Sequence, residues 1–178
     1  MRCTDRVVGG AAAIAAFDLA TKFAAVSLVD GRRFGVIAPT HNDAFSLGIA
    51  SSGRAVVLGL AASALVAAAL GTALVMRRSD LPAWIPAFVL GGAASNLIDR
   101  TVFGSVHDFF VVPPVVLNVA DVAVVAGLVG YGRWRRSRRQ AAQLAGQHLR
   151  ETKPRLLVAP TRPSRARPWP GARPRPRP

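Results

Sequence analysis

The sequence predicts an all-α integral membrane protein with four transmembrane helices, small extracytoplasmic segments and a disordered basic C-terminal tail. Hydrophobic residues make up 51% of the 178 residues, which is enough for one membrane domain. The formal net charge of +14 is concentrated at one end. Residues 133–178 contain 14 basic residues and one acid, Glu151, whereas residues 1–132 contain 9 basic and 8 acidic residues. We therefore predict a transmembrane domain over residues 1–132 and a cytoplasmic Arg/Pro-rich tail, mostly disordered, over residues 133–178.

Four apolar runs account for the predicted helices. Each is close to the roughly 17–25 residues that a helix needs to cross a bilayer. Runs this continuous lack the polar stripe that a water-facing helix shows, so a soluble bundle with buried helices is the less favoured alternative. The runs are Val7–Val29, Ala55–Val75, Leu81–Ile98 and Val115–Tyr131.

The first run is long enough to span the membrane, so we predict a retained helix and not a cleaved signal peptide. Cys3 precedes it and is the only cysteine, which excludes an intramolecular disulfide. We interpret Cys3 as an incidental thiol. Asp18 and Lys22 lie four residues apart within this run, so we predict that they pair on one helical face and have a structural role.

The flanking charges of the runs predict the topology. Basic residues lie before the first run, between the second and third runs at Arg77 and Arg78, and after the fourth run at 133–139. The positive-inside rule then places both termini in the cytoplasm and residues 30–54 and 99–114 outside. In the third run, small residues at 91–95 predict close helix packing, although Gly91 and Gly92 could equally serve a site.

Polar side chains gather near the outer ends of the third and fourth runs, where lipid would not tolerate them without partners. Three near the end of the third run are spaced i, i+3 and i+4, and two near the start of the fourth share a helical face. A further aspartate lies in the short loop between the runs. In chain order these residues are Asn96, Asp99, Arg100, Asp108, Asn118 and Asp121.

Asp108 and Asp121 can approach each other at the membrane boundary in this arrangement. Two adjacent carboxylates resist double ionisation, so one would hold a proton at neutral pH while the other stays charged. An aspartic protease needs such a pair: the charged member takes a proton from water, and the protonated member donates a hydrogen bond to the scissile carbonyl. The spacing alone leaves open an ion or proton pathway lined by the same carboxylates.

No metal or cofactor is predicted. The three histidines, His41, His107 and His148, lack zinc-like spacing, and we interpret His41 and His107 as surface residues. The glycine pairs lie inside apolar runs and not between a strand and a helix, so they do not predict a phosphate-binding loop.

At these residues the sequence resembles the lipoprotein signal peptidase family (signal peptidase II), which are membrane aspartic proteases of bacteria. The resemblance covers roughly residues 10–131. GGAASNLIDR at 91–100 is similar to the family's Gly-Gly-Ala-x-x-Asn-x-x-Asp-Arg block, and VHDF at 106–109 to its Val-x-Asp-Phe block. VLNVAD at 116–121 is similar to the Phe-Asn-x-Ala-Asp block, with Leu117 in place of Phe, and DLATK at 18–22 adds a fourth match.

The resemblance implies a substrate and a location. The family cleaves the signal peptide of prolipoproteins immediately before a cysteine that already carries diacylglyceryl. The expected partners are therefore lipid-modified prolipoproteins and membrane lipids, and the expected location is the bacterial cell membrane with the active site at its outer face. The implied catalytic residues are Asp108 and Asp121, the implied substrate-binding residues are Asn96, Arg100 and Asn118, and Asp99 is implied as structural support beside Asp18 and Lys22.

Two segments depart from the family pattern. Leu19 stands where the family usually has Gln, and THNDAFSLGI at 40–49 matches only the Ala-Phe-Ser end of the usual Asn-x-Gly-x-Ala-Phe block. That alignment places Thr40 at the usual Asn position, whereas a shifted register offers Asn42, which we keep as a substrate-binding candidate. The altered block motivates the alternative of a non-catalytic relative that binds lipidated peptides.

The tail beyond Gly146 is rich in Pro, Arg and Ala, and eight of the thirteen prolines lie at or after Pro154. Such a segment cannot bury a core, so we predict disorder with polyproline-II character. Its expected neighbours are the anionic lipid headgroups of the inner leaflet. No specific nucleic acid partner is expected, because Trp169 is the only aromatic residue in this segment.

Overall fold

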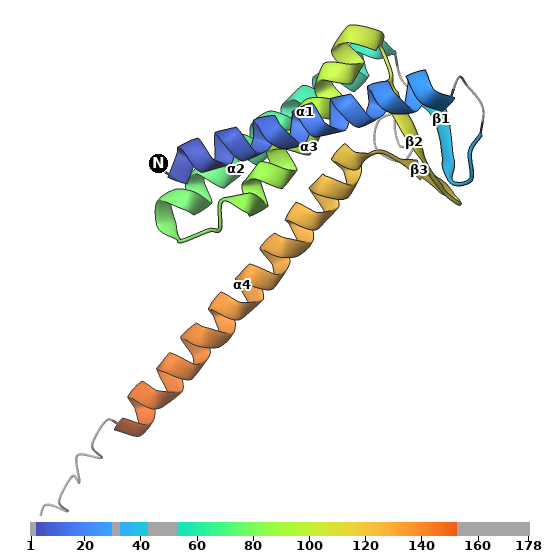
Figure 1. Ribbon diagram of the computed structural model, residues 1–178. Helices are drawn as coiled ribbons and strands as arrows, with labels where there is room; N and C mark the ends of the chain where they lie inside the picture. Colours follow the sequence, from blue (N-terminus) through green and yellow to red (C-terminus); the bar gives the residue numbers. More distant parts are fainter. Residues whose placement is uncertain (1–2, 30–32, 43–52, 153–178) are drawn as a thin grey trace, which may run out of the picture. The chain divides into compact units, whose positions relative to one another are not determined.

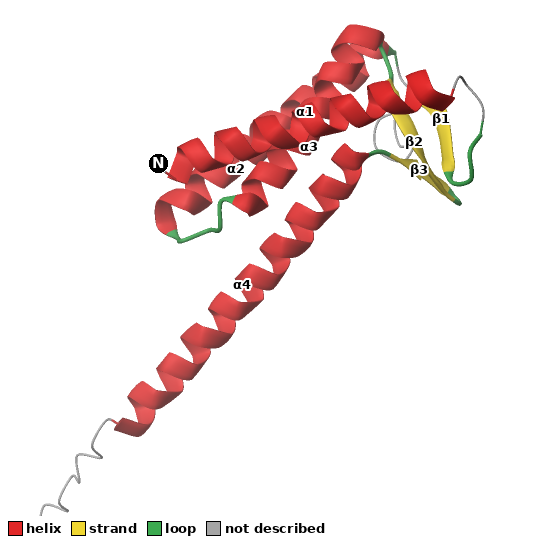
Figure 2. Cartoon of the chain, in the orientation of Figure 1, coloured by secondary structure: helices red, strands yellow, loops and turns green. Residues whose placement is uncertain are grey.

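The computed structural model describes residues 3–29, 33–42 and 53–152. The chain divides into two compact units, Met1–Arg139 and Gln140–Pro178. Figure 1 shows the elements along the chain and Figure 2 their helical or extended character. The elements are α1 (Cys3–Val29), β1 (Ile37–Asn42), α2 (Arg54–Arg78), α3 (Trp84–Phe103), β2 (Val106–Val112), β3 (Val115–Leu117) and α4 (Val119–Thr152).

The first unit exposes many large apolar side chains and buries several charged ones, which is unusual for a water-soluble protein. Large apolar side chains such as Phe23 and Leu70 are exposed, while Asp18, Lys22 and Asp99 are almost completely buried. This distribution is typical of helices that face lipid and enclose a polar site. Among the described residues, two helices are long and apolar enough to cross a membrane, α1 over Cys3–Ser27 and α2 over Arg54–Arg78.

The predicted all-α fold is confirmed in its helices but wrong in one respect, because the structure also contains a three-stranded antiparallel sheet in the order β1-β2-β3. The β-branched residues on both sides of the Pro113-Pro114 turn favour extended backbone, and through them β2 and β3 pair with each other. The fourth apolar run therefore begins as strand β3, and its helix begins only at Val119.

The sheet register sets which residues lie beside Asp108. In the β1–β2 pair, Thr40 lies opposite Asp108 and Asn42 opposite Val106. In the β2–β3 pair, Phe110 lies opposite Leu117, so the chain leaves β3 directly into Asn118 at the start of α4. The central strand β2 is thereby held between the segment of Asn42 and the segment of Asn118.

Glycines on α3 allow α1 and α4 to approach it closely. A Cβ added at Gly91 would lie 2.6 Å from the carbonyl oxygen of Ala11 in α1, and one added at Gly92 would lie 2.9 Å from a methyl carbon of Val124 in α4. Neither position has room for a larger side chain. Packing therefore accounts for both glycines, a choice that the sequence left open.

Helix α4 continues to Thr152, beyond the predicted domain boundary at residue 132. Residues 133–152 belong to the segment that the sequence predicts to be mostly disordered, and in the structure they are helical. Good helix formers such as Arg, Gln, Ala and Leu dominate this stretch, and the next proline is Pro154. Residues 153–178 and the Ala44-Phe45-Ser46 block, on which two further predictions depend, lie outside the described residues.

Candidate active site

Asn118 and Asp121 form a reciprocal cap at the start of α4. The backbone N–H of Asp121 donates to Oδ1 of Asn118 at 2.9 Å, and the backbone N–H of Asn118 donates to Oδ2 of Asp121 at 3.2 Å. This exchange satisfies two amides that the first helical turn leaves without intrahelical partners. The geometry of the helix end therefore holds both side chains in one orientation.

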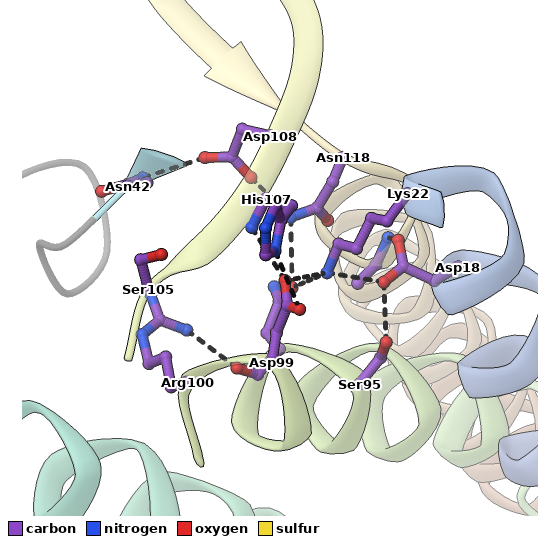
Figure 3. A network of polar contacts seen from close by, with 12 residues as sticks. Asp18, Lys22, Asn42, Ser95, Asp99, Arg100, Ser105, His107, Asp108 and Asn118 are labelled. Carbon is purple, nitrogen blue, oxygen red and sulfur yellow. Dashed lines mark hydrogen bonds and ion pairs between the residues drawn. The ribbon is translucent and has the colours of Figure 1, made fainter. Parts of the chain in front are cut away.

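Asn118 also reaches across to the central strand. Its Nδ2 donates to Oδ1 of Asp108 at 2.6 Å, and Asp108 is 2% exposed. One asparagine thus contacts both aspartates that the sequence singled out, Asp108 from β2 and Asp121 from α4 (Figure 3 labels the first of them). The structure brings these two carboxyl groups to one place, as the sequence predicted.

Asn96 of α3 completes the link between the helices. Its Oδ1 accepts from Nζ of Lys22 at 2.8 Å and from Nδ2 of Asn118 at 3.1 Å. Because the oxygen faces these two donors, the amide nitrogen is turned to Asp121, to which it donates at 2.9 Å. The Asn96 side chain therefore connects a buried lysine to one of the two aspartates.

Lys22 pairs with two buried carboxylates. Its Nζ lies 2.7 Å from Asp18 and 3.2 Å from Asp99, so the pair predicted from the four-residue spacing is present and has a second acidic member (Figure 3). Asp18 also accepts from the hydroxyl of Ser95 and from the backbone N–H of Ala120, each at 2.7 Å. Asp18 therefore ties α1 to both α3 and the first turn of α4.

His107 was predicted to be a surface residue, and this prediction is wrong. Its side chain is only 16% exposed, its Nδ1 lies 3.1 Å from Oδ1 of Asp99, and its backbone N–H donates to Oδ2 of Asp99 at 2.8 Å. The ring also contacts those of His41 and Phe103 edge to face. The only signal in the sequence was the position of His107 directly before Asp108.

Asn42 and Arg100 approach the site from the remaining sides. Nδ2 of Asn42 donates to Oδ2 of Asp108 at 3.0 Å, and the hydroxyl of Thr40 donates to the carbonyl oxygen of Asp108 at 3.2 Å. Arg100 is buried, and its Nη1 donates to the carbonyl oxygen of Asn96 at 3.4 Å. Every site residue predicted from the sequence therefore lies in this cluster or directly beside it.

The environment of Asp108 favours its protonated form. Burial raises the pKa of the Asp108 carboxyl above its ordinary value. Hydrogen bonds from Asn42 and Asn118 and the charges of Lys22 and Arg100 act in the opposite direction, and burial is the larger effect. A carboxyl group that retains a proton more readily than usual can serve as a hydrogen-bond donor.

The site therefore combines two carboxyl groups, three asparagine amides and a buried guanidinium. A carboxyl pair of this kind can transfer protons to and from a water molecule, and the amides and guanidinium can hold carbonyl or phosphate oxygens. Within the described ranges, no group of three His, Cys, Asp or Glu side chains is arranged to hold a metal ion. The expectation that no cofactor takes part stays a prediction.

Comparison with known proteins points to one family. The sequence model of signal peptidase (SPase) II matches residues 10–132. A lipoprotein signal peptidase of Methylobacterium sp. (strain 4-46) is 34% identical over 137 residues, which cover 67% of this chain and 82% of that protein. A lipoprotein signal peptidase of Methylorubrum extorquens is 43% identical over 72 residues, which cover 36% of this chain and 42% of that protein.

The fold has solved counterparts. A bacterial membrane enzyme structure superposes with a TM-score of 0.55 at 19% identity, covering 70% of this chain and 84% of the other. A second structure of a bacterial membrane enzyme superposes with a TM-score of 0.54 at 20% identity, covering 70% of this chain and 88% of the other. At 19–20% identity, the similarity to these two structures shows a shared fold and nothing more.

Proposed function

Since this chain belongs to the signal peptidase II family, we propose that it removes the signal peptide from diacylglyceryl-modified prolipoproteins, with Asp108 and Asp121 as the catalytic pair. The observation that carries the proposal is the contact of Asn118 with both carboxyl groups, at 2.6 Å to Asp108 and 3.2 Å to Asp121. The side-chain amide of Asn118 donates to Asp108 and its backbone N–H donates to Asp121, so one residue would keep the two groups at a constant separation while their protonation changes.

The reaction uses one proton shared by the two aspartates. The ionised carboxyl removes a proton from a water molecule, whose oxygen attacks the scissile carbonyl carbon, while the protonated carboxyl donates a hydrogen bond to the carbonyl oxygen. A proton then passes to the leaving amide nitrogen as the carbon–nitrogen bond breaks. The product amine belongs to the lipid-modified cysteine, and the new carboxyl group belongs to the released signal peptide.

The remaining polar residues are proposed to hold the substrate. Asn42 and Asn96 present amides next to the aspartates, and backbone oxygens of an extended peptide are suitable partners for them. Asn118 is completely buried and its Nδ2 donates to Asp108 and Asn96, so it would act on the substrate by positioning the two aspartates. Arg100 offers a planar fork of donors for peptide or lipid headgroup oxygens, which a lysine would not reproduce. Asp18, Lys22 and Asp99 would hold Asn96 and the neighbouring helices in place without contacting the peptide.

The proposed setting is the bacterial cell membrane. Helices α1 and α2 are long and apolar enough to span a bilayer. We propose that α3 and the first part of α4 also span it, so that four helices cross the membrane and both termini are cytoplasmic. The sheet and the two aspartates then lie at the outer face, where a lipid-anchored precursor presents its cleavage site. The C-terminal tail would lie near anionic headgroups of the inner leaflet.

Two other functions have a basis in the sequence. A non-catalytic relative that binds lipidated peptides is suggested by the altered block at 40–49, but Asn42 of that block donates to Asp108, so the block still contributes a side chain to the site. An ion or proton pathway would need polar groups along the full depth of the helices, and Ala55–Val75 of α2 contains no ionisable residue.

The test compares two precursors. The purified full-length chain in micelles is mixed with a prolipoprotein that carries diacylglyceryl on its cysteine, or with the same precursor lacking the lipid. Mass spectrometry should find the signal peptide released from the lipidated form, cut immediately before the cysteine, and no release from the other. Binding of the lipidated precursor without cleavage would favour the non-catalytic alternative, and cleavage of both forms would refute the proposed substrate.

A further inference from the structure

A cavity of about 430 Å³ lies between the start of α3 and the middle of α4. Arg133, on its lining, is twelve residues after Asp121 on the same helix, so the cavity lies about 18 Å along α4 from the candidate active site. The proposed peptidase function makes no use of it. Residues on its lining include Trp84, Ile85, Val129, Arg133, Trp134 and Ser137.

The apolar side of the cavity is built around a glycine. A Cβ added at Gly130 would lie 2.8 Å from ring carbon Cζ3 of Trp84, so the absence of a side chain lets the indole rest on the α4 backbone. Trp84 is nonetheless 49% exposed, and Ile85 and Val129 extend the same apolar wall. The cavity therefore offers apolar surface that remains accessible from outside the protein.

The polar side of the cavity is cationic. Arg133 and Ser137 are four residues apart on one face of α4, and the Ser137 hydroxyl donates to the Arg133 carbonyl oxygen at 3.2 Å. The neighbouring segments 77–80 and 133–139 together contain seven arginines and one acid, Asp80. An arginine guanidinium binds phosphate oxygens through two parallel hydrogen bonds, and the surrounding positive charge favours an anion.

We propose that this cavity binds one anionic phospholipid, with its phosphate at Arg133 and the upper part of an acyl chain along Trp84, Ile85 and Val129. The volume lies within the range of roughly 300–1,000 Å³ that small-molecule sites have, which suits a headgroup and the first acyl carbons. The apolar wall selects an amphiphile over free phosphate. The cationic side selects an anionic lipid over a zwitterionic one, as expected of basic pockets between membrane helices.

Tryptophan fluorescence can test this site directly in the full-length protein. The chain has three tryptophans, Trp84, Trp134 and Trp169, and the first two line the cavity. In a Trp169→Phe background, emission therefore reports on the cavity alone. Phosphatidylglycerol with brominated acyl chains is titrated into the protein in micelles of an uncharged detergent, and brominated phosphatidylcholine and inorganic phosphate are titrated in parallel.

We expect saturable quenching by brominated phosphatidylglycerol at concentrations at least about tenfold lower than for brominated phosphatidylcholine. Unbrominated phosphatidylglycerol should reverse the quenching by competition, and inorganic phosphate should not. Arg133→Gln should raise the half-saturating concentration about tenfold. The matched control Arg135→Gln removes the same charge two residues away, on another face of α4 and off the cavity lining, and should change it less than about twofold.

Three results would overturn the proposal. Equal effects of Arg133→Gln and Arg135→Gln would mean that general surface charge and not the cavity attracts the lipid. Equal quenching by the two brominated lipids would mean that no anionic headgroup is selected. Competition by inorganic phosphate at concentrations similar to those of the lipid would mean that Arg133 binds anions without the apolar wall.

Discussion

Asp18→Asn tests the buried charge network that supports the active site. The substitution keeps the size of the side chain but leaves Lys22 with Asp99 as its acidic partner, in a position where Asp18 is 0% exposed and Lys22 is 3% exposed. It also places an amide nitrogen where carboxylate oxygens accept from Ser95 and from the backbone of Ala120. The first change removes one of the two carboxylates that compensate the charge of Lys22, and the second turns an amide donor toward a buried donor and so leaves one hydrogen bond unmade.

The expected magnitude follows from these contacts. Breaking a buried ion pair by removing one member costs about 3–5 kcal/mol. Asp99 remains 3.2 Å from Lys22, so we expect the lower end, about 3 kcal/mol of unfolding free energy. For a chain of this length, 1 kcal/mol shifts Tm by roughly 2–4 °C, so Tm should fall by about 6–12 °C.

The assay is thermal unfolding of purified protein in micelles, combined with cleavage of the lipidated precursor per folded molecule. Asp80→Asn, which removes the same charge from an exposed position between α2 and α3, is the matched control and should shift Tm by less than about 2 °C. Specific activity of Asp18→Asn should stay near that of the wild type. A Tm drop no larger than that of Asp80→Asn, or a stable but inactive variant, would refute the structural role assigned to Asp18.

Four further predictions concern the site and the tail. Asp108→Asn and Asp121→Asn should each reduce cleavage by at least about 10³-fold with normal membrane insertion, and the double variant should be hardly slower, whereas near-wild-type turnover of either would refute the dyad. Burial raises the pKa of Asp108, so the folded state binds more protons than the unfolded state, and wild-type stability should fall as pH rises above the ordinary aspartate pKa. The Tm of Asp108→Asn minus that of the wild type should therefore be larger at about pH 7 than at about pH 4, and the opposite trend would contradict the burial argument. His107→Ala removes a hydrogen bond to buried Asp99, worth roughly 1.5–3 kcal/mol, and should lower Tm measurably, whereas His107→Asn keeps a side-chain N–H donor and should lower it less; equal losses would show that the Asp99 contact is unimportant. Deleting residues 147–178 should leave cleavage of the lipidated precursor unchanged, and a loss of cleavage in a normally inserted protein would assign the tail a role in catalysis.

The sequence by itself determined the features that depend on helical spacing. The pairing of Asp18 with Lys22 follows from a separation of four residues within one helix. Asn118 and Asp121 also meet through their separation of three, but as a cap and not on a shared helical face, because Asn118 precedes the first residue of α4. The long apolar runs likewise predicted helices without reference to any other part of the chain. The motifs around Asp108 and Asp121 also identified the family through local residue order.

Only the tertiary structure decided which distant segments meet. Asn42 contacts Asp108, 66 residues away, because β1 pairs with β2. The local sequence of a strand does not specify which other strand it will pair with. Lys22 reaches Asn96, 74 residues away, because Gly91 and Gly92 let α1, α3 and α4 pack closely. The partial burial of His107 has the same origin, because a lone histidine carries no periodic signal and its contact with Asp99 forms where the end of α3 meets β2.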